Sequence, residues 1–146
     1  MLSLRQATIS DAKRLFDWRT DPATRLASHV DAEFEFASHL SWLKETLENP
    51  ARILFIAEEN GCPVGTVRVD YEFNDGVQLS WTIGPEFRGR KIAAHMVQLV
   101  TKSLPWSHYI RAEVKIGNEA SIKVALAVGM MLCRQEGDVL HFIRRM

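Results

Sequence analysis

The spacing of apolar positions changes along the first third of the chain. Leu2–Ala7 alternates apolar and polar side chains, which is typical of a half-buried strand. Apolar residues then recur at helical spacing in two stretches, Ser10–Arg19 and about Glu35–Leu47. Ser10 is expected to cap the first helix, and Asp21-Pro22 is expected to end it.

The middle of the chain has the pattern of consecutive strands. Three segments rich in apolar or alternating residues, Ile53–Glu58, Pro63–Tyr71 and Val77–Ile83, are separated by short turn sequences. Asn60-Gly61 is a strong hairpin turn, and Asn74-Asp75-Gly76 is a second turn. These segments predict an antiparallel meander.

The last third alternates helices and strands. Two helices are expected, Ile92–Ser103 and Asn118–Val128, with Gly129 ending the second. The expected strands are Tyr109–Ile116, Met130–Gln135 and Val139–Arg144. The order of elements predicts an α/β (α+β) fold, with a mixed, mostly antiparallel central sheet of about seven strands flanked by four helices.

Size and composition indicate one globular domain that spans residues 1–146. The chain is 47% hydrophobic and 25% charged, with 18 basic and 18 acidic residues. A net charge of zero disfavours a nucleic-acid-binding protein. No secretion signal and no apolar run of about 20 residues is visible, so we expect a cytoplasmic protein without a membrane partner.

The two cysteines, Cys62 and Cys133, are not in a C-x-x-C pair. The usual spacing of a zinc site is therefore missing, and no metal is expected. Cys133 lies in a strand pattern, and no paired base is evident that would activate it as a nucleophile. We expect it to be a buried structural residue.

The strand-to-helix connection at residues 83–93 carries the strongest chemical signal. The first amides of a helix lack internal partners, and the helix dipole makes that end positive, so such an end binds phosphate. Gly89 allows close approach of the backbone to a ligand, and the small Ala93 keeps the first turn open. Positive charge is added by Arg88, Arg90 and Lys91. The segment favours pyrophosphate binding; the alternative is a helix start that merely has basic residues.

The same segment resembles the cofactor motif of the GCN5-related N-acetyltransferase (GNAT) family, Q/R-x-x-G-x-G/A. Arg88 fills the first position and Ala93 the last, whereas Lys91 stands where the family usually has its middle glycine. Asn118-Glu119-Ala120-Ser121, followed by Gly129-Met130, resembles the family's N-x-x-[AS]…G-[FM] segment. The resemblance covers nearly the whole chain, from Leu2 to Arg144.

The resemblance implies acetyl-CoA as acyl donor and direct attack by an amine, without an acyl-enzyme. It implies that the strands Val77–Ile83 and Tyr109–Ile116 splay apart, and that the pantetheine arm lies between them. The expected cofactor-binding residues are Ile83, Arg88, Gly89, Arg90, Lys91, Ile92, Ala93, Asn118 and Ser121.

Glu113 is the candidate general base. The Glu113-Val114-Lys115 stretch resembles the Glu-Val-Arg of ribosomal-protein alanine acetyltransferases, in which that glutamate is the proposed base. The alternative is a surface glutamate paired with Arg111 or Lys115. Ala125 stands where the family often has a tyrosine acid, so no acid is assigned, although Ser121 could donate a hydrogen bond near the sulfur.

The first third of the chain suggests an acceptor. Asp17-Trp18-Arg19-Thr20-Asp21-Pro22 resembles the W-R-[ND]-D segment of acetyltransferases acting on nucleotide-linked amino sugars, as in pseudaminic-acid biosynthesis. Arg19 and Arg25 would meet a sugar-linked phosphate, and Trp18 or His29 would stack on a ring. The alternative is that Trp18 belongs to the core and the arginines are solvated.

Other acceptors stay open, namely ribosomal-protein or other peptide N-termini and small amines. A catalytically silent acetyl-CoA-binding module is a further alternative, which Lys91 and Ala125 favour slightly. An RNA-binding sheet is disfavoured because the aromatic residues are scattered. A homodimer is expected from the family alone.

Overall fold

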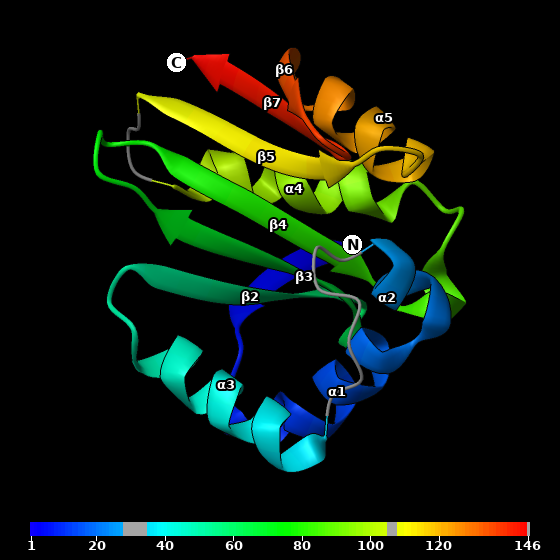
Figure 1. Ribbon diagram of the computed structural model, residues 1–146. Coiled ribbons are helices and arrows are strands. Elements are labelled where there is room, and N and C mark those ends of the chain that lie inside the picture. The colour runs from blue at the N-terminus through cyan, green and yellow to red at the C-terminus, as the bar shows by residue number, and fades with distance from the viewer. Residues whose placement is uncertain (28–34, 105–107, 146) are drawn as a thin grey trace.

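The computed structural model describes residues 1–27, 35–104 and 108–145. Within them, seven strands form one sheet in the order β1-β2-β3-β4-β5-β7-β6 (Figure 1). Every neighbouring pair is antiparallel except β4 and β5, which are parallel. The strands are β1 (Leu2–Gln6), β2 (Arg52–Glu59), β3 (Cys62–Tyr71), β4 (Val77–Ile83), β5 (Tyr109–Lys115), β6 (Met131–Glu136) and β7 (Val139–Arg145).

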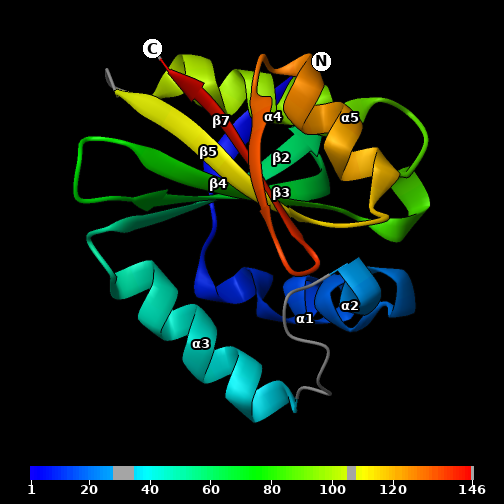
Figure 2. The same cartoon turned by 45° about the horizontal axis from the view of Figure 1, so that its top comes forward.

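Helices cover both faces of the sheet, with α4 and α5 on one side and α1, α2 and α3 on the other (Figure 2). The α-helices are α1 (Ala12–Thr20), α2 (Pro22–Ala27), α3 (Phe36–Glu48), α4 (Ile92–Ser103) and α5 (Glu119–Ala127). Two short 3-10 helices, Ile9–Asp11 and Pro85–Phe87, precede α1 and α4. This arrangement confirms the fold class, the antiparallel meander of β2 to β4 and the four expected helices.

Two apolar cores hold the layers together. The larger lies between the sheet and the helices α4 and α5, and its most buried members include Leu79, Met96 and Ile110, each at most 1% exposed. The smaller joins α1 and α3 to the sheet. It includes Leu43 and Ile56, which are fully buried. Alternation along the strands and helical spacing along α3 and α4 predict this burial, because each element has one apolar side.

The start of the first helix differs from the prediction. Ser10 lies inside the 3-10 helix rather than at an N-cap, and α1 begins at Ala12. The Asp11 carboxylate instead accepts a hydrogen bond from the Thr8 backbone N–H at 2.8 Å. Asp21 ends α1 as expected, but the chain then forms the additional helix α2, because Pro22 is well suited to a first helical position.

One expectation of burial is wrong. Cys133 is exposed, because β6 is an edge strand of the sheet and all of its residues are exposed. β5 ends at Lys115, one residue earlier than expected, and Ile116 is 54% exposed. Both cysteines are free thiols.

No helix in the described part of the chain is long and apolar enough to cross a bilayer.

Asp11 anchors β1 to the start of the helical layer. It is 7% exposed, and its two carboxylate oxygens accept bonds from the Arg5 guanidinium at 2.8 and 2.9 Å. These bonds hold the pKa of Asp11 below its ordinary value of 3.8, although burial acts in the opposite direction. Because the folded pKa is depressed, the stabilisation is present above the unfolded pKa and disappears as pH falls through the folded one.

We predict that Asp11→Asn lowers the free energy of unfolding at neutral pH by about 1–3 kcal/mol, the value of a hydrogen bond to a charged group. The difference from the parent should shrink as pH falls below about 4. Urea denaturation across pH measures it. Asp17→Asn is the matched control, because its exposed pair with Lys13 should contribute under about 1 kcal/mol. A difference that is constant with pH would contradict the assignment.

Candidate active site

The strands β4 and β5 separate after a short contact. Only two residue pairs join them in the described sheet, Val77 with Ile110 and Gln78 with Arg111. β5 instead pairs with β7 over its whole length, from Tyr109 to Lys115. The second half of β4 therefore has no strand partner on its β5 side in the described part of the chain, and Figure 1 shows the two strands diverging there. Unpaired backbone groups at such an edge can bind an extended ligand as an added strand.

The connection from β4 to α4 adopts backbone angles suited to glycine. Gly89 has φ 79°, and Lys91, the residue before α4, has φ 58° and ψ 20°. The family's middle glycine corresponds to Lys91, so the backbone conformation is one that glycine adopts readily while a lysine bears the cost. Ile92 is buried and fixes the first turn of α4 to the core. The free amides of α4 thus lie beside the diverging strands.

The two arginines of this connection already have carboxylate partners. Arg88 donates to Asp21 at 2.6 Å and to the Thr24 hydroxyl at 3.0 Å, which joins the connection to α2. Arg90 donates to Glu59 at 2.8 Å. Hydrogen bonding from Arg88 lowers the pKa of Asp21. Both guanidinium groups remain substantially exposed, so an anionic ligand can reach them in competition with these carboxylates.

The start of α5 lies near the same end of the sheet (Figure 1). Asn118 caps α5, because its side-chain oxygen accepts a hydrogen bond from the Ser121 backbone N–H at 3.3 Å. Asn118 and Ser121, the two residues expected to bind the cofactor from this segment, therefore have a structural role as the N-terminal cap of α5. Ala125 is fully buried in the larger core, so a tyrosine at this position would need space that the packing does not leave.

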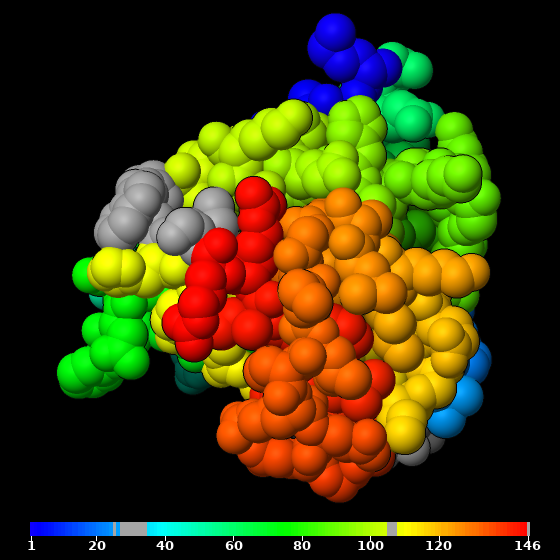
Figure 3. Space-filling model, turned by 90° about the horizontal axis from the view of Figure 1, so that it is seen from above, coloured from blue at the N-terminus to red at the C-terminus, as the bar shows by residue number. Residues whose placement is uncertain are grey.

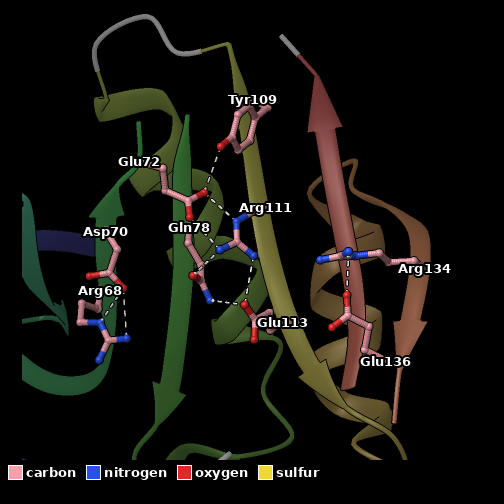
Figure 4. A network of polar contacts seen from close by, with 9 residues as sticks. All are labelled: Arg68, Asp70, Glu72, Gln78, Tyr109, Arg111, Glu113, Arg134 and Glu136. Carbon is pink, nitrogen blue, oxygen red and sulfur yellow. Dashed lines mark hydrogen bonds and ion pairs between the residues drawn. The ribbon is translucent and has the colours of Figure 1, made fainter. Parts of the chain in front are cut away.

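A network of charged side chains surrounds Glu113 (Figure 4). Arg111 donates to both oxygens of Glu72, at 2.6 and 2.7 Å, and to Glu113 at 3.0 Å. Gln78 accepts from Arg111 at 2.9 Å and donates to Glu113 at 3.3 Å, and Tyr109 donates to Glu72 at 3.2 Å. The Arg111 contacts lower the pKa of Glu72 despite its partial burial, and Glu72 in turn raises the pKa of Arg111.

Glu113 lies on β5 two residues past its last pairing with β4. Its carboxylate consequently borders the place where the strands separate. The expected alternative, an ion pair with Arg111, is present, so Glu113 is both a partner of Arg111 and a side chain at the strand opening. A side chain about one quarter exposed at this point can still reach a bound amine.

Two of the residues expected to bind the acceptor, Trp18 and Arg19, lie at the smaller core rather than in an open site. Trp18 is 5% exposed in the smaller core, and a Cβ added at Gly84 would lie 2.9 Å from its ring. This burial leaves the ring no open face for stacking. The Arg19 guanidinium lies 4.3 Å from the centre of the Trp42 ring, and burial together with the nearby Arg68 lowers its pKa.

The other two residues expected to bind the acceptor are Arg25 and His29. Arg25 belongs to α2, and His29 lies outside the described residues.

Three carboxylates of this region were not identified from the sequence: Asp21, Glu59 and Glu72. Arg111 was considered only as a partner of Glu113, and not as the residue that binds both Glu72 and Glu113. The signal for Arg111 was present, since it alternates with Glu113 on the polar side of β5. Its other partner, Glu72, comes from the end of β3, and nothing in the local sequence indicates that contact.

Comparisons agree with this architecture. Residues 1–131 match the model of the acetyltransferase (GNAT) domain. No curated protein matches the sequence. A domain from Methanocaldococcus jannaschii is 24% identical, with a TM-score of 0.89 over 100% of this chain and 99% of that chain.

Two enzymes of known substrate share the fold. A spermidine N-acetyltransferase from Vibrio cholerae, solved with CoA and spermine, is 14% identical with a TM-score of 0.89, covering 99% of this chain and 95% of that one. The aminoglycoside acetyltransferase AAC(6')-Ib, solved with coenzyme A, is 14% identical with a TM-score of 0.86 over the same shares.

We predict that Lys91→Gly is at least as stable as the parent, because it relieves the left-handed backbone. Lys91→Val keeps the same loss of charge but should cost about 1–3 kcal/mol, because a β-branched residue is strained at positive φ. Thermal and urea denaturation of both variants measure this. Equal stability of the two variants would show that residue 91 is not left-handed in solution.

Proposed function

The chain belongs to the acetyltransferase (GNAT) family, and from this premise we propose that it transfers an acetyl group from acetyl-CoA to a primary amine by direct attack. The observation that carries the proposal is the separation of β4 from β5 beside the first turn of α4. An unpaired strand edge suits the amide-rich pantetheine arm, and a positive helix end suits a diphosphate.

The residues present fit the acyl donor. The backbone of Gly89, Lys91 and Ile92 would face the diphosphate, because it forms the left-handed approach to α4. Arg88, Arg90 and Lys91 would supply the charge, and the small Ala93 would keep the first turn open. The β4 backbone up to Ile83 would hold the pantetheine arm, with Asn118 and Ser121 at the facing end of α5.

Acetyl-CoA supplies the acyl group as a thioester. We assign Glu113 the task of taking the proton from the attacking amine, directly or through one water. Arg111 and Gln78 orient this carboxylate, because each donates to the same oxygen, Oε2. No acid is assigned, since Ala125 stands where the family often has a tyrosine.

A nucleotide-linked amino sugar remains a proposed acceptor, with support from the Trp18-Arg19 segment in sequence only. The buried Trp18 ring removes stacking from the argument. Spermidine and aminoglycosides, the acceptors of the two structural neighbours, share with it a primary amine, which is the feature that Glu113 requires.

We predict that Arg88→Ala weakens acetyl-CoA binding roughly 10- to 100-fold, the loss of about one charge-assisted hydrogen bond. Titration calorimetry with acetyl-CoA measures the affinity. Asp21→Asn is the matched control, because it removes the carboxylate charge that pairs with Arg88 but keeps the cation. Equal losses in both variants would show that Arg88 acts through α2 rather than on the phosphate.

We predict that Glu113→Gln lowers kcat by about 100-fold or more, with little change in KM for acetyl-CoA, because a positioned base typically contributes that factor. Glu72→Gln disturbs the same arginine without removing the proposed base, and it should cost far less. Steady-state assay of CoA release checks both. If the two variants lose activity equally, Glu113 serves only to hold Arg111.

A further inference from the structure

Three polar side chains lie in one row across the face of the sheet that carries Glu113. Glu113 on β5 pairs with His141 on β7, and His141 pairs with Arg134 on β6. Residues paired across neighbouring strands point to the same face, so these side chains share one surface. Figure 4 shows Glu113 and Arg134 on this face. All three line one open pocket of about 980 Å3.

Negative charge at the inner end of this row is compensated in part. The single cation Arg111 binds both oxygens of Glu72 and one oxygen of Glu113, so two carboxylates share one guanidinium. The remaining negative charge suits one ammonium group. A second ammonium group further along the row would lie between cations, and like charges repel most strongly where water is partly excluded.

Positive charge gathers at the outer end. The two cations Arg134 and Arg145 line the same pocket. Arg134 pairs with Glu136 at 2.6 Å, but the two side chains are 60% and 58% exposed. Exposed pairs of this kind contribute little, so a ligand anion can replace Glu136. A guanidinium also binds a carboxylate or phosphate through two parallel hydrogen bonds, which adds geometric selectivity.

We infer that the acceptor is an amine that carries an anionic group, with the amine at Glu113 and the carboxylate or phosphate at Arg134. The position of the amine rests on the proposed function. Two inter-strand spacings separate the backbones of β5 and β6, so the two ends of the acceptor lie within about 10 Å of each other. Arg134 thereby determines acceptor specificity, and His141 lies between the two ends with a ring N–H able to donate.

A set of amines of one length tests this directly: hexylamine, hexamethylenediamine, ε-aminocaproate and aminohexyl phosphate. Their far ends are neutral, cationic, carboxylate and phosphate. With saturating acetyl-CoA, kcat/KM for the better anionic amine should exceed that for hexylamine about tenfold or more, and hexamethylenediamine should be the poorest. The order of the two anionic amines assigns the group as carboxylate or phosphate.

Arg134→Gln should reduce the ratio of anionic to neutral amine to about one, whereas Arg14→Gln, on the exposed side of α1, should keep the parent ratio. Preference for hexamethylenediamine, or an anionic preference that survives Arg134→Gln, overturns the inference.

Calorimetry of aminohexyl phosphate against the CoA complex gives a readout without turnover. Binding that Arg134→Gln weakens supports the inference, and no binding overturns it. Acetyl-CoA affinity, measured separately, distinguishes failure of this inference from failure of the proposed function. If the protein binds acetyl-CoA and acetylates another amine, only the inference on the acceptor fails. If it binds no acetyl-CoA, the proposed function fails as well.

Discussion

The limited pairing of β4 with β5 is the constraint on which the rest of the site depends. Two residue pairs keep the strands in one sheet, and the full pairing of β5 with β7 then carries β5 away from β4. The second half of β4 is left without a strand partner on that side among the described residues, and Glu113 lies at the border of this edge. A β5 paired with β4 along its length would leave the positive end of α4 without an adjoining strand edge.

Charge is balanced locally as well as over the chain. The net charge of the chain is zero. Within it, Arg88, Arg90 and Arg111 each bind a carboxylate from a segment distant in the sequence. The same Arg111 also binds Glu113 at 3.0 Å. The Arg88 bond to the Thr24 hydroxyl joins the β4–α4 connection to α2, and Lys115 joins α2 to β5 by donating to the Leu26 carbonyl at 3.3 Å. Through these two contacts, α2 joins the β4–α4 connection, where the acyl donor is proposed to bind, to the strand that carries Glu113.

The sequence predicts most of the fold because period and turn chemistry are local. Ile92–Ser103 is found with its expected bounds, and the Asn60-Gly61 hairpin has both residues at positive φ. The motif before α4 could also be predicted from the sequence, because its glycine positions correspond to residues with positive φ, Gly89 and Lys91. Contacts between distant segments could not: Arg88 and Asp21 are 67 positions apart, and their pairing depends on how α2 packs.

Two errors have the same origin. Trp18 was considered for ligand stacking, but its burial depends on the closeness of Gly84, which only the tertiary packing decides. Cys133 was expected in the core, but it lies on the edge strand β6, whose residues are all exposed. Alternation predicts which residues share a face, whereas the position of a strand within the sheet depends on contacts between distant segments.

The central claim is that the unpaired half of β4 binds the acyl donor as an added strand. Hydrogen exchange of backbone amides, compared with and without acetyl-CoA, tests it most directly. The account predicts that binding slows exchange between Leu79 and Ile83 and in the first turn of α4, while the fully paired β7 is unaffected. Tight binding of acetyl-CoA that leaves exchange in both of these segments unchanged would contradict it.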